Sequence, residues 1–132
     1  MADNFALTGS YTTTPNVGAP STIADLVAPL NEEYQLLAKQ LVSGLQLNAD
    51  SPQAVPFGAV GTVTPGGANI IIIKSPSLKI DAVLTSADGT SQVIPVDGFL
   101  ALISHTVPYT ALSLTRLAGQ VTTVDVFLGQ TA

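Results

Sequence analysis

The sequence predicts a mainly β protein: an antiparallel β-sandwich or jelly-roll-like domain with an N-terminal extended arm and one amphipathic helix. From residue 57 onward, short apolar runs rich in Val, Ile and Thr alternate with turn signals such as Asp88-Gly89. Many short strands separated by glycine and proline are typical of sandwiches, jelly rolls and small barrels. The length of 132 residues suits one domain.

We expect residues 1–20 to form the arm and residues 21–132 to form a single β-rich domain, with a helical segment at 22–47 and the sandwich at 57–129. The arm is rich in Thr, Gly, Pro and Asn, which favour extended or turn conformations and bury little surface. Its spaced apolar residues could dock on a partner or fold back onto their own domain. The candidate partner-binding residues are Phe5, Leu7 and Tyr11.

The helix is predicted by the spacing of apolar residues in segment 31–47. One helical face would carry Tyr34, Leu37, Leu41 and Leu45. Asn31 is a suitable cap, and Glu32 and Glu33 would lie in the first turn, where the helix dipole favours acidic groups. Pro29 separates this helix from a shorter helical stretch before it. The helix would cover a sheet or a neighbouring molecule.

The β-strands are predicted from apolar runs bounded by turn residues. Asp88-Gly89 predicts a hairpin, Pro95 predicts an edge position for its strand, and Asp97-Gly98 predicts a second turn. The four consecutive Ile residues at 70–73 predict a strand that is buried on both faces. Strands are expected at residues 57–63, 70–74, 78–85, 92–96, 99–104, 111–116 and 121–128.

The composition limits the partners of the protein. Hydrophobic residues make up 46% of the chain and charged residues 10%, whereas about 25% charged residues is typical. Such a surface predicts oligomerisation or docking on a larger assembly, although a compact domain coated with Thr, Ser and Gln is an alternative. The net charge is −5, and the four basic residues form no stripe for nucleic acid or an anionic membrane. They are Lys39, Lys74, Lys79 and Arg116.

The chain also lacks the usual signals for export and for disulfide bonds. It contains no Cys, so neither disulfides nor thiolate metal sites are expected. The first five residues lack the basic and apolar regions of a signal peptide. The apolar run at 70–73 is too short to span a bilayer. We expect a soluble protein that is not exported by an ordinary signal.

Few residues could carry catalysis. His105 is the only imidazole, and the adjacent Ser104 would point to the opposite face of a strand. A small hydrolase would need His105 to meet a carboxylate such as Asp97 or Asp125 across the fold. The carboxylates are widely spaced apart from Glu32-Glu33, and the glycine-containing stretches match no nucleotide-binding motif. We expect a non-enzymatic protein without a cofactor or a metal.

Three C-terminal segments, QVIPVDGFL, PYTALSLTR and VFLG, resemble small virion proteins of tailed bacteriophages. They occupy residues 92–100, 108–116 and 126–129. The chain is most similar to capsid decoration (cement) proteins, which are acidic, cysteine-free and rich in Thr and Gly, with an arm and a β-sandwich. The resemblance covers about the last third of the chain and carries no catalytic motif.

This resemblance implies a structural protein that binds and stabilises the phage capsid shell. The implied partner is the major capsid protein, with homo-oligomerisation, and the implied location is the capsid surface of the virion after synthesis in the host cytoplasm. In such families the arm and the sandwich edges clamp neighbouring subunits. A sheet edge, either the strand with Pro95 or the last strand, could pair with a neighbour's backbone.

A helix at 31–47 is not a required part of that pattern, so other virion roles stay open. The alternatives are a head–tail connector, a tail or fibre-base component, or a receptor- or carbohydrate-binding module.

Overall fold

The computed structural model describes residues 3–9 and 30–131, in which the chain is mainly β with one short helix. The chain divides into two compact units, Met1–Gln35 and Leu36–Ala132. The first contains β1 (Asp3–Gly9), which is the neighbour of β2 in the sheet order. Strand β2 (Leu30–Leu47) begins in the first unit and continues into the second.

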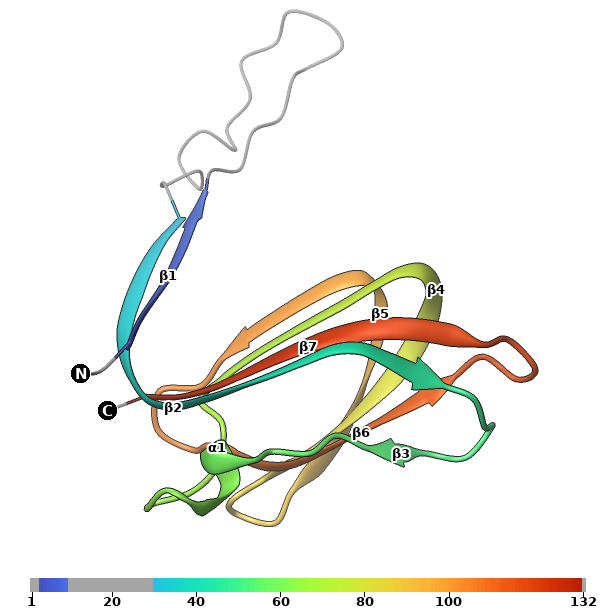
Figure 1. The fold of residues 1–132 in the computed structure, drawn as a ribbon. Helices are drawn as coiled ribbons and strands as arrows, with labels where there is room; N and C mark the ends of the chain where they lie inside the picture. The colour runs from blue at the N-terminus through green and yellow to red at the C-terminus, as the bar shows by residue number, and fades with distance from the viewer. Residues whose placement is uncertain (1–2, 10–29, 132) are drawn as a thin grey trace, which may run out of the picture. The chain divides into compact units, whose positions relative to one another are not determined.

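The second unit contains the remaining elements. The sheet order is β1-β2-β7-β4-β6-β3, and β5 pairs with β4 outside this path (Figure 1). The pairs of strands within the second unit are antiparallel. The expected mainly β, antiparallel architecture is therefore confirmed, in the form of a curled sheet. The further elements of the second unit are β3 (Gln53–Ala54), α1 (Ala59–Thr62), β4 (Ile70–Ser86), β5 (Ser91–Ile103), β6 (Tyr109–Arg116) and β7 (Thr122–Thr131).

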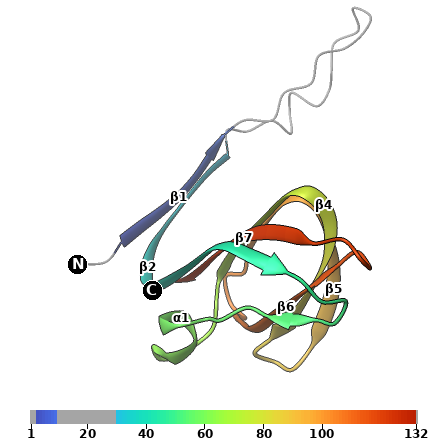
Figure 2. The same ribbon diagram turned by 45° about the vertical axis from the view of Figure 1, so that its right-hand side comes forward.

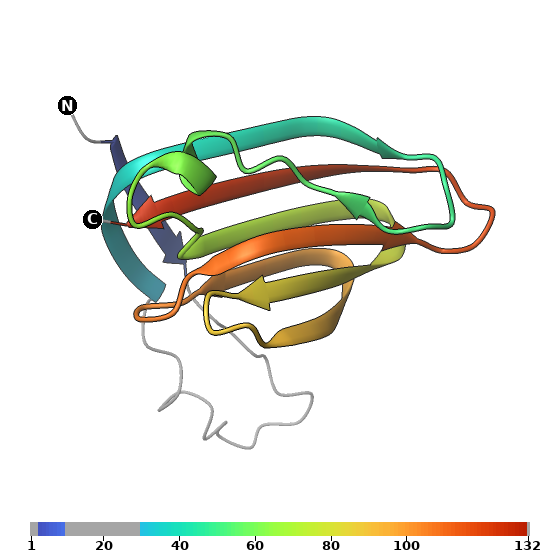
Figure 3. The same cartoon turned by 90° about the horizontal axis from the view of Figure 1, so that it is seen from below.

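The curl originates in the long strand β4. On one edge, its residues 70–74 pair with β7 and its residues 80–86 pair with β6, while β5 follows both halves on the other edge (Figure 3). Between these halves the register with β5 jumps from Ser75 to Ile80. The Ser75 side chain is buried, and its hydroxyl donates to the carbonyl oxygen of Leu78 across the irregularity.

This irregularity keeps both halves of β4 directed toward one core. Side chains alternate between faces along a strand, and Ile71 and Ile73 face the core in the first half. After an odd step from Ser75 to Ile80, the even-numbered residues of the second half face inward. The core comprises Ala38, Leu47, Val55, Val60, Ala68, Ile71, Ile73, Ile80, Ala82, Leu84, Val96, Leu112, Leu114, Val124, Val126 and Leu128.

A short segment around α1 closes one end of this core (Figure 2). Val60 is fully buried, and Phe57 packs against the core from the turn before the helix. The Gln130 side chain of β7 is buried, and its Nε2 donates to the carbonyl oxygen of Val63 at 2.9 Å. The expected strand at 57–63 is therefore wrong: its apolar residues cap the core through a helical turn.

The predicted helix at 31–47 is also wrong, because this segment is strand β2. Leu36, Ala38 and Leu47 are buried, whereas Leu41 is 67% exposed. Two register shifts against β7, one between residues 36 and 38 and one between residues 42 and 45, interrupt the strand alternation. Leu37 and Leu41 are exposed between these buried positions, so apolar residues on both faces of the strand recur at spacings that imitate a helix. Extensive pairing with β7 overrides local helix propensity. The shorter helical stretch before Pro29 lies outside the described residues.

Glycines with positive φ angles explain the irregularities in β2 and β5. Gly44, at φ 68°, lies at the second register shift of β2, where its N–H donates to the Asp125 carboxylate at 2.8 Å. Gly98, at φ 103°, pairs with Ser75 at the bend of β4. The predicted turn at Asp97-Gly98 is wrong because β5 runs through it; the positive φ serves a bulge rather than a reversal.

Two local predictions are confirmed. The segment containing Asp88-Gly89 joins β4 to β5 as a hairpin. Strand β5, which contains Pro95, pairs only with β4 among the described residues and is therefore an edge strand. The last strand, β7, pairs with β2 and, over residues 125–129, with β4 as well, so this part of it has strand partners on both edges. Pairing of either strand with a neighbour's backbone stays a prediction.

We predict that Leu114→Ala lowers the free energy of unfolding by about 2–5 kcal/mol, because Leu114 is fully buried and its truncation leaves a cavity. The matched control is Leu117→Ala, since Leu117 is 45% exposed and its truncation is expected to cost about 0.5 kcal/mol or less. Chemical denaturation monitored by circular dichroism measures both values. Equal losses in the two variants would contradict this placement of the core.

Candidate interaction surface

The predicted arm anchors lie partly within the described chain. Phe5 lies in β1 and is half-buried, and Leu7 lies in the same strand. Tyr11 lies outside the described residues. The role of Phe5, Leu7 and Tyr11 in binding a partner stays a prediction.

His105 lies in the loop between β5 and β6 and is exposed. The hydroxyl of the adjacent Ser104 donates to the carbonyl oxygen of Val107 and is therefore held within its own loop. Within residues 3–9 and 30–131, no three His, Cys, Asp or Glu side chains are grouped so that they could hold a metal ion. The expectation of a non-enzymatic protein stays a prediction.

Two aspartates, Asp125 and Asp88, hold local backbone in place. Asp125 of β7 accepts the N–H of Gly44, as described above. Asp88 accepts the N–H of Thr90 at 3.0 Å and its hydroxyl at 2.7 Å. These bonds, the backbone N–H first, hold the pKa of Asp88 below its usual value. Both carboxylates therefore have structural partners at turns and bulges.

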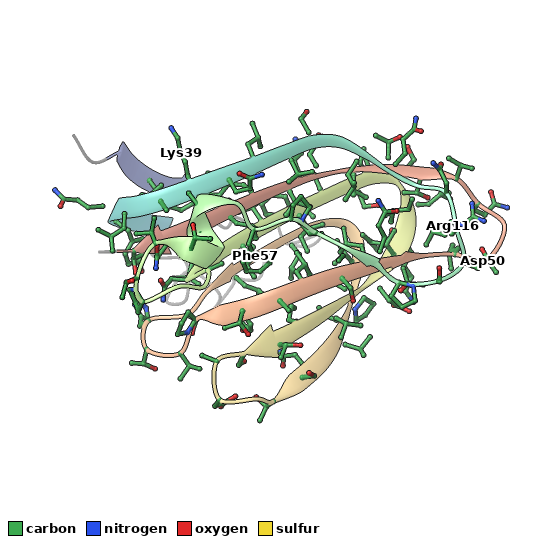
Figure 4. The ribbon with its side chains drawn as sticks, turned by 60° about the horizontal axis from the view of Figure 1, so that its bottom comes forward. Lys39, Asp50, Phe57 and Arg116 are labelled. Carbon is green, nitrogen blue, oxygen red and sulfur yellow. The ribbon has the colours of Figure 1, made fainter. Side chains whose placement is uncertain are left out.

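A third carboxylate, Asp50, joins two loops at one end of the sheet. It accepts the N–H of Gly119 at 2.9 Å and the Nε of Arg116 at 3.0 Å, and the Arg116 Nη2 lies 2.9 Å away (Figure 4). The Gly119 N–H and then the Arg116 guanidinium lower the pKa of Asp50. This bridge ties the loop after β2 to the turn between β6 and β7.

The face of the sheet opposite the core is the strongest candidate for an interaction site. On β7 and the first half of β4, the core takes Val126, Leu128, Ile71 and Ile73. Because side chains alternate along a strand, the residues between them point to the other face. The outer face thus contains one row that crosses four hydrogen-bonded strands: Leu41 of β2, Phe127 of β7, Ile72 of β4 and Ala101 of β5.

We call this row, together with Phe99 and Ile103 of β5, the outer apolar face. The four-residue row is about 14 Å wide, given a spacing of about 4.7 Å between strands. Leu41 is 67% exposed and Phe99 is 57% exposed, while the other members retain partial exposure. A connected patch of this kind on a monomer typically marks an interaction site.

Polar groups border the outer apolar face. Lys39 lies on one side, in register with Gly129 of β7. On the other side Lys74 of β4 lies between Asp125 of β7 and Phe99 of β5. Figure 4 shows Lys39 pointing away from the interior in which Phe57 lies. An apolar centre with a polar rim is the usual anatomy of a protein–protein interface.

Gly129 of β7 leaves room for side chains next to the outer apolar face to pack closely together. A Cβ there would lie 3.1 Å from Leu36 Cδ2, 3.2 Å from Phe127 Cε1 and 3.4 Å from Ile70 Cβ. Leu36 and Ile70 are buried. The expectation that the Ile run is buried on both faces is thus met by Ile70 and Ile71, whereas Ile72 keeps partial exposure. The absence of a side chain at 129 lets Phe127 lie against this buried pair.

A shallow depression elsewhere offers little chemistry. Its lining is Gly61, Pro65, Gly66, Gly67, Ala87, Thr106, Pro108 and Thr110. These lining residues carry no titratable side chain, so the depression has backbone groups and two hydroxyls as its polar features.

The outer apolar face was missed at the sequence level. The helix prediction places Leu41 on the face that would cover a sheet or a neighbouring molecule, and the prediction of a strand at 99–104 does not indicate an exposed apolar face. The signal that could have found it is the presence of apolar residues at both odd and even positions of 70–73 and 99–103. Such strands have two apolar faces, and one core covers only one of them.

No family model, curated protein or solved structure matches this chain. Within the described residues, none of the helical structure is long and apolar enough to cross a membrane.

We predict that Asp50→Asn reduces the sensitivity of stability to acid. Because folding lowers the pKa of Asp50 from 3.8, its charged form stabilises the fold above that value, and this contribution is lost as the pH falls below it. Melting temperatures between pH 5 and pH 2.5 should therefore fall less steeply in Asp50→Asn than in the wild type. Asp97→Asn is the control, since Asp97 is exposed and accepts no hydrogen bond from the described residues. Identical acid slopes in wild type and Asp50→Asn would refute this role.

Proposed function

We propose that this protein is a non-enzymatic virion structural protein of a tailed bacteriophage, of the capsid decoration (cement) type, and that it binds the assembled shell through the outer apolar face. The observation that carries the proposal is the apolar row across β2, β7, β4 and β5, which leaves Leu41 67% exposed. A capsid surface offers a large, repeated area against which this row could lose its contact with water.

The mechanism is stabilisation by preferential binding. A protein that binds the assembled shell, and not its dissociated subunits, shifts the assembly equilibrium toward the shell by mass action. Burial of a large apolar side chain contributes about 1.5–3 kcal/mol. Burial of the exposed side chains of this face therefore favours binding to the shell without any covalent bond. The partner is the major capsid protein, and the protein is located on the capsid surface after synthesis in the host cytoplasm.

The resemblance to decoration proteins supports the same surface. Of the three segments that carry it, residues 92–100 lie in β5 and residues 126–129 lie in β7. These segments contribute Phe99 and Phe127 to the outer apolar face. In this proposal, the curled sheet takes the part of the β-sandwich of decoration proteins.

The decisive test of location is immunogold electron microscopy of purified particles from the strain that encodes the chain. Label distributed over the head supports a decoration protein. Label confined to the head–tail junction, the tail or the fibre base would replace the proposal with one of those roles, and unlabelled particles would overturn a virion role altogether.

We predict that Leu41→Glu lowers occupancy on capsids by at least tenfold while leaving the melting temperature nearly unchanged. The substitution places a charge at the β2 end of the apolar row, where it would lose its hydration in the contact. The control is Val121→Glu, which makes a similar change at a residue 61% exposed in the turn before β7. Cosedimentation with capsids stripped of the protein measures occupancy. Equal binding by both variants would exclude this face as the contact.

A second prediction concerns the arm and is independent of the outer apolar face. Deletion of residues 1–20 should weaken capsid binding while Leu36–Ala132 stays folded, because residues 3–9, the described part of this segment, contribute nothing to the core. Circular dichroism tests the fold, and the same cosedimentation assay tests binding. Unchanged occupancy after the deletion would remove Phe5, Leu7 and Tyr11 as anchors without affecting the role proposed for the outer apolar face.

A further inference from the structure

Strand β5 has a free edge among the described residues, and its register with β4 shows which of its backbone N–H and C=O groups point toward that edge. The Ser104 N–H donates to the Asn69 carbonyl oxygen, and the pair Ile103–Ile70 follows it in the ladder. In an antiparallel pair, directly opposed residues alternate between hydrogen-bonded and non-hydrogen-bonded positions. Leu102 and Leu100 therefore bond to β4, whereas the N–H and C=O groups of Phe99, Ala101 and Ile103 point away from it.

The first half of this edge, at residues 91–95, is blocked. The Ser86 N–H donates to the Thr90 carbonyl oxygen, so the following pair, Thr85–Ser91, is non-hydrogen-bonded. The edge-facing residues of this half are accordingly Ser91, Val93 and Pro95. Pro95 supplies no N–H there, and its ring obstructs an incoming strand. Only the half at residues 99–103 presents an uninterrupted set of donors and acceptors.

The open half is self-complementary. Its sequence, Phe-Leu-Ala-Leu-Ile, has a small residue in the middle and large apolar residues placed symmetrically on both sides. All five residues retain solvent exposure, in contrast to the buried inward residues of β7. Uncharged, proline-free edges of this kind favour pairing with another strand.

We propose that two copies of this chain associate by antiparallel pairing of their β5 edges about a two-fold axis at Ala101. In this register Ala101 of one copy lies opposite Ala101 of the second copy, and Phe99 lies opposite the second copy's Ile103. All three edge-facing residues then form hydrogen-bonded pairs, so the interface satisfies the free backbone groups of both strands. Asp97 and His105 flank the segment, so an acidic residue of one copy approaches an imidazole of the other rather than a second acidic residue.

This pairing would also extend the outer apolar face. The row Leu41–Phe127–Ile72–Ala101 would continue across the axis into the same row of the second copy in reverse order. The dimer would thus present one apolar surface of twice the width. The association itself does not depend on the capsid and is measured in its absence.

The test is the oligomeric state of the full chain, measured by sedimentation velocity over a range of concentrations. We expect a wild-type dimer and, in Ala101→Pro, an increase in Kd of at least about tenfold, because two N–H donors at the axis are lost. The β4 ladder does not use this N–H, so the fold should persist. Val93→Pro is the matched control: its N–H also faces the edge, but in the half already blocked by Pro95, and its dimer should be retained.

Ala101→Lys provides a second variant, because it sets two like charges against each other at the axis without altering the backbone. It should also dissociate the dimer. A monomeric wild type, a dimer that survives Ala101→Pro or Ala101→Lys, or an equal loss in Val93→Pro would each overturn the proposal.

Discussion

The structure of the second unit depends on the bend in strand β4 between Ser75 and Ile80. A straight 17-residue strand would carry its inward side chains past the end of so small a core. At the bend, extra residues of β4 lie opposite a single residue of β5. As a result, odd-numbered side chains face the core before the bend and even-numbered side chains face it after the bend. Ile71 and Leu84, from opposite ends of the strand, thereby reach the same core. The pairing of β7 with one half and of β6 with the other follows from this bend.

The bend also determines which surfaces are left uncovered. Because β6 and β7 share one edge of β4, the opposite edge is left to β5, whose own outer edge has no partner among the described residues. The apolar residues that alternate with the core residues then lie together on the outer face. A free edge and an apolar face on adjoining strands suit a protein that works by association. Such an arrangement is also a hazard for aggregation, and Pro95 protects half of the edge.

Local polar contacts in the second unit hold its bulges, turns and loops in place. Asp125 secures the bulge of β2, Asp88 secures the β4–β5 turn, and Asp50 with Arg116 joins two loops at one end. Each of these carboxylates fixes a backbone irregularity that the strand pairing requires. These four charged groups therefore hold local backbone in place, whereas the outer apolar face is the surface proposed to contact a partner.

The sequence by itself determined the β character of the chain, the hairpin at Asp88-Gly89 and the edge position of the strand with Pro95. These features depend on local backbone preferences of Gly, Pro and β-branched residues, which act without knowledge of distant partners. Tertiary structure alone decided that segment 31–47 is a strand, because its pairing with β7 joins residues that are between 75 (Leu47 and Thr122) and 95 (Leu36 and Thr131) positions apart in the chain. It also decided that Leu41, Phe127, Ile72 and Ala101 form one row. Alternation predicts which side of a strand a residue takes, but only strand order and register bring four separate segments onto one face.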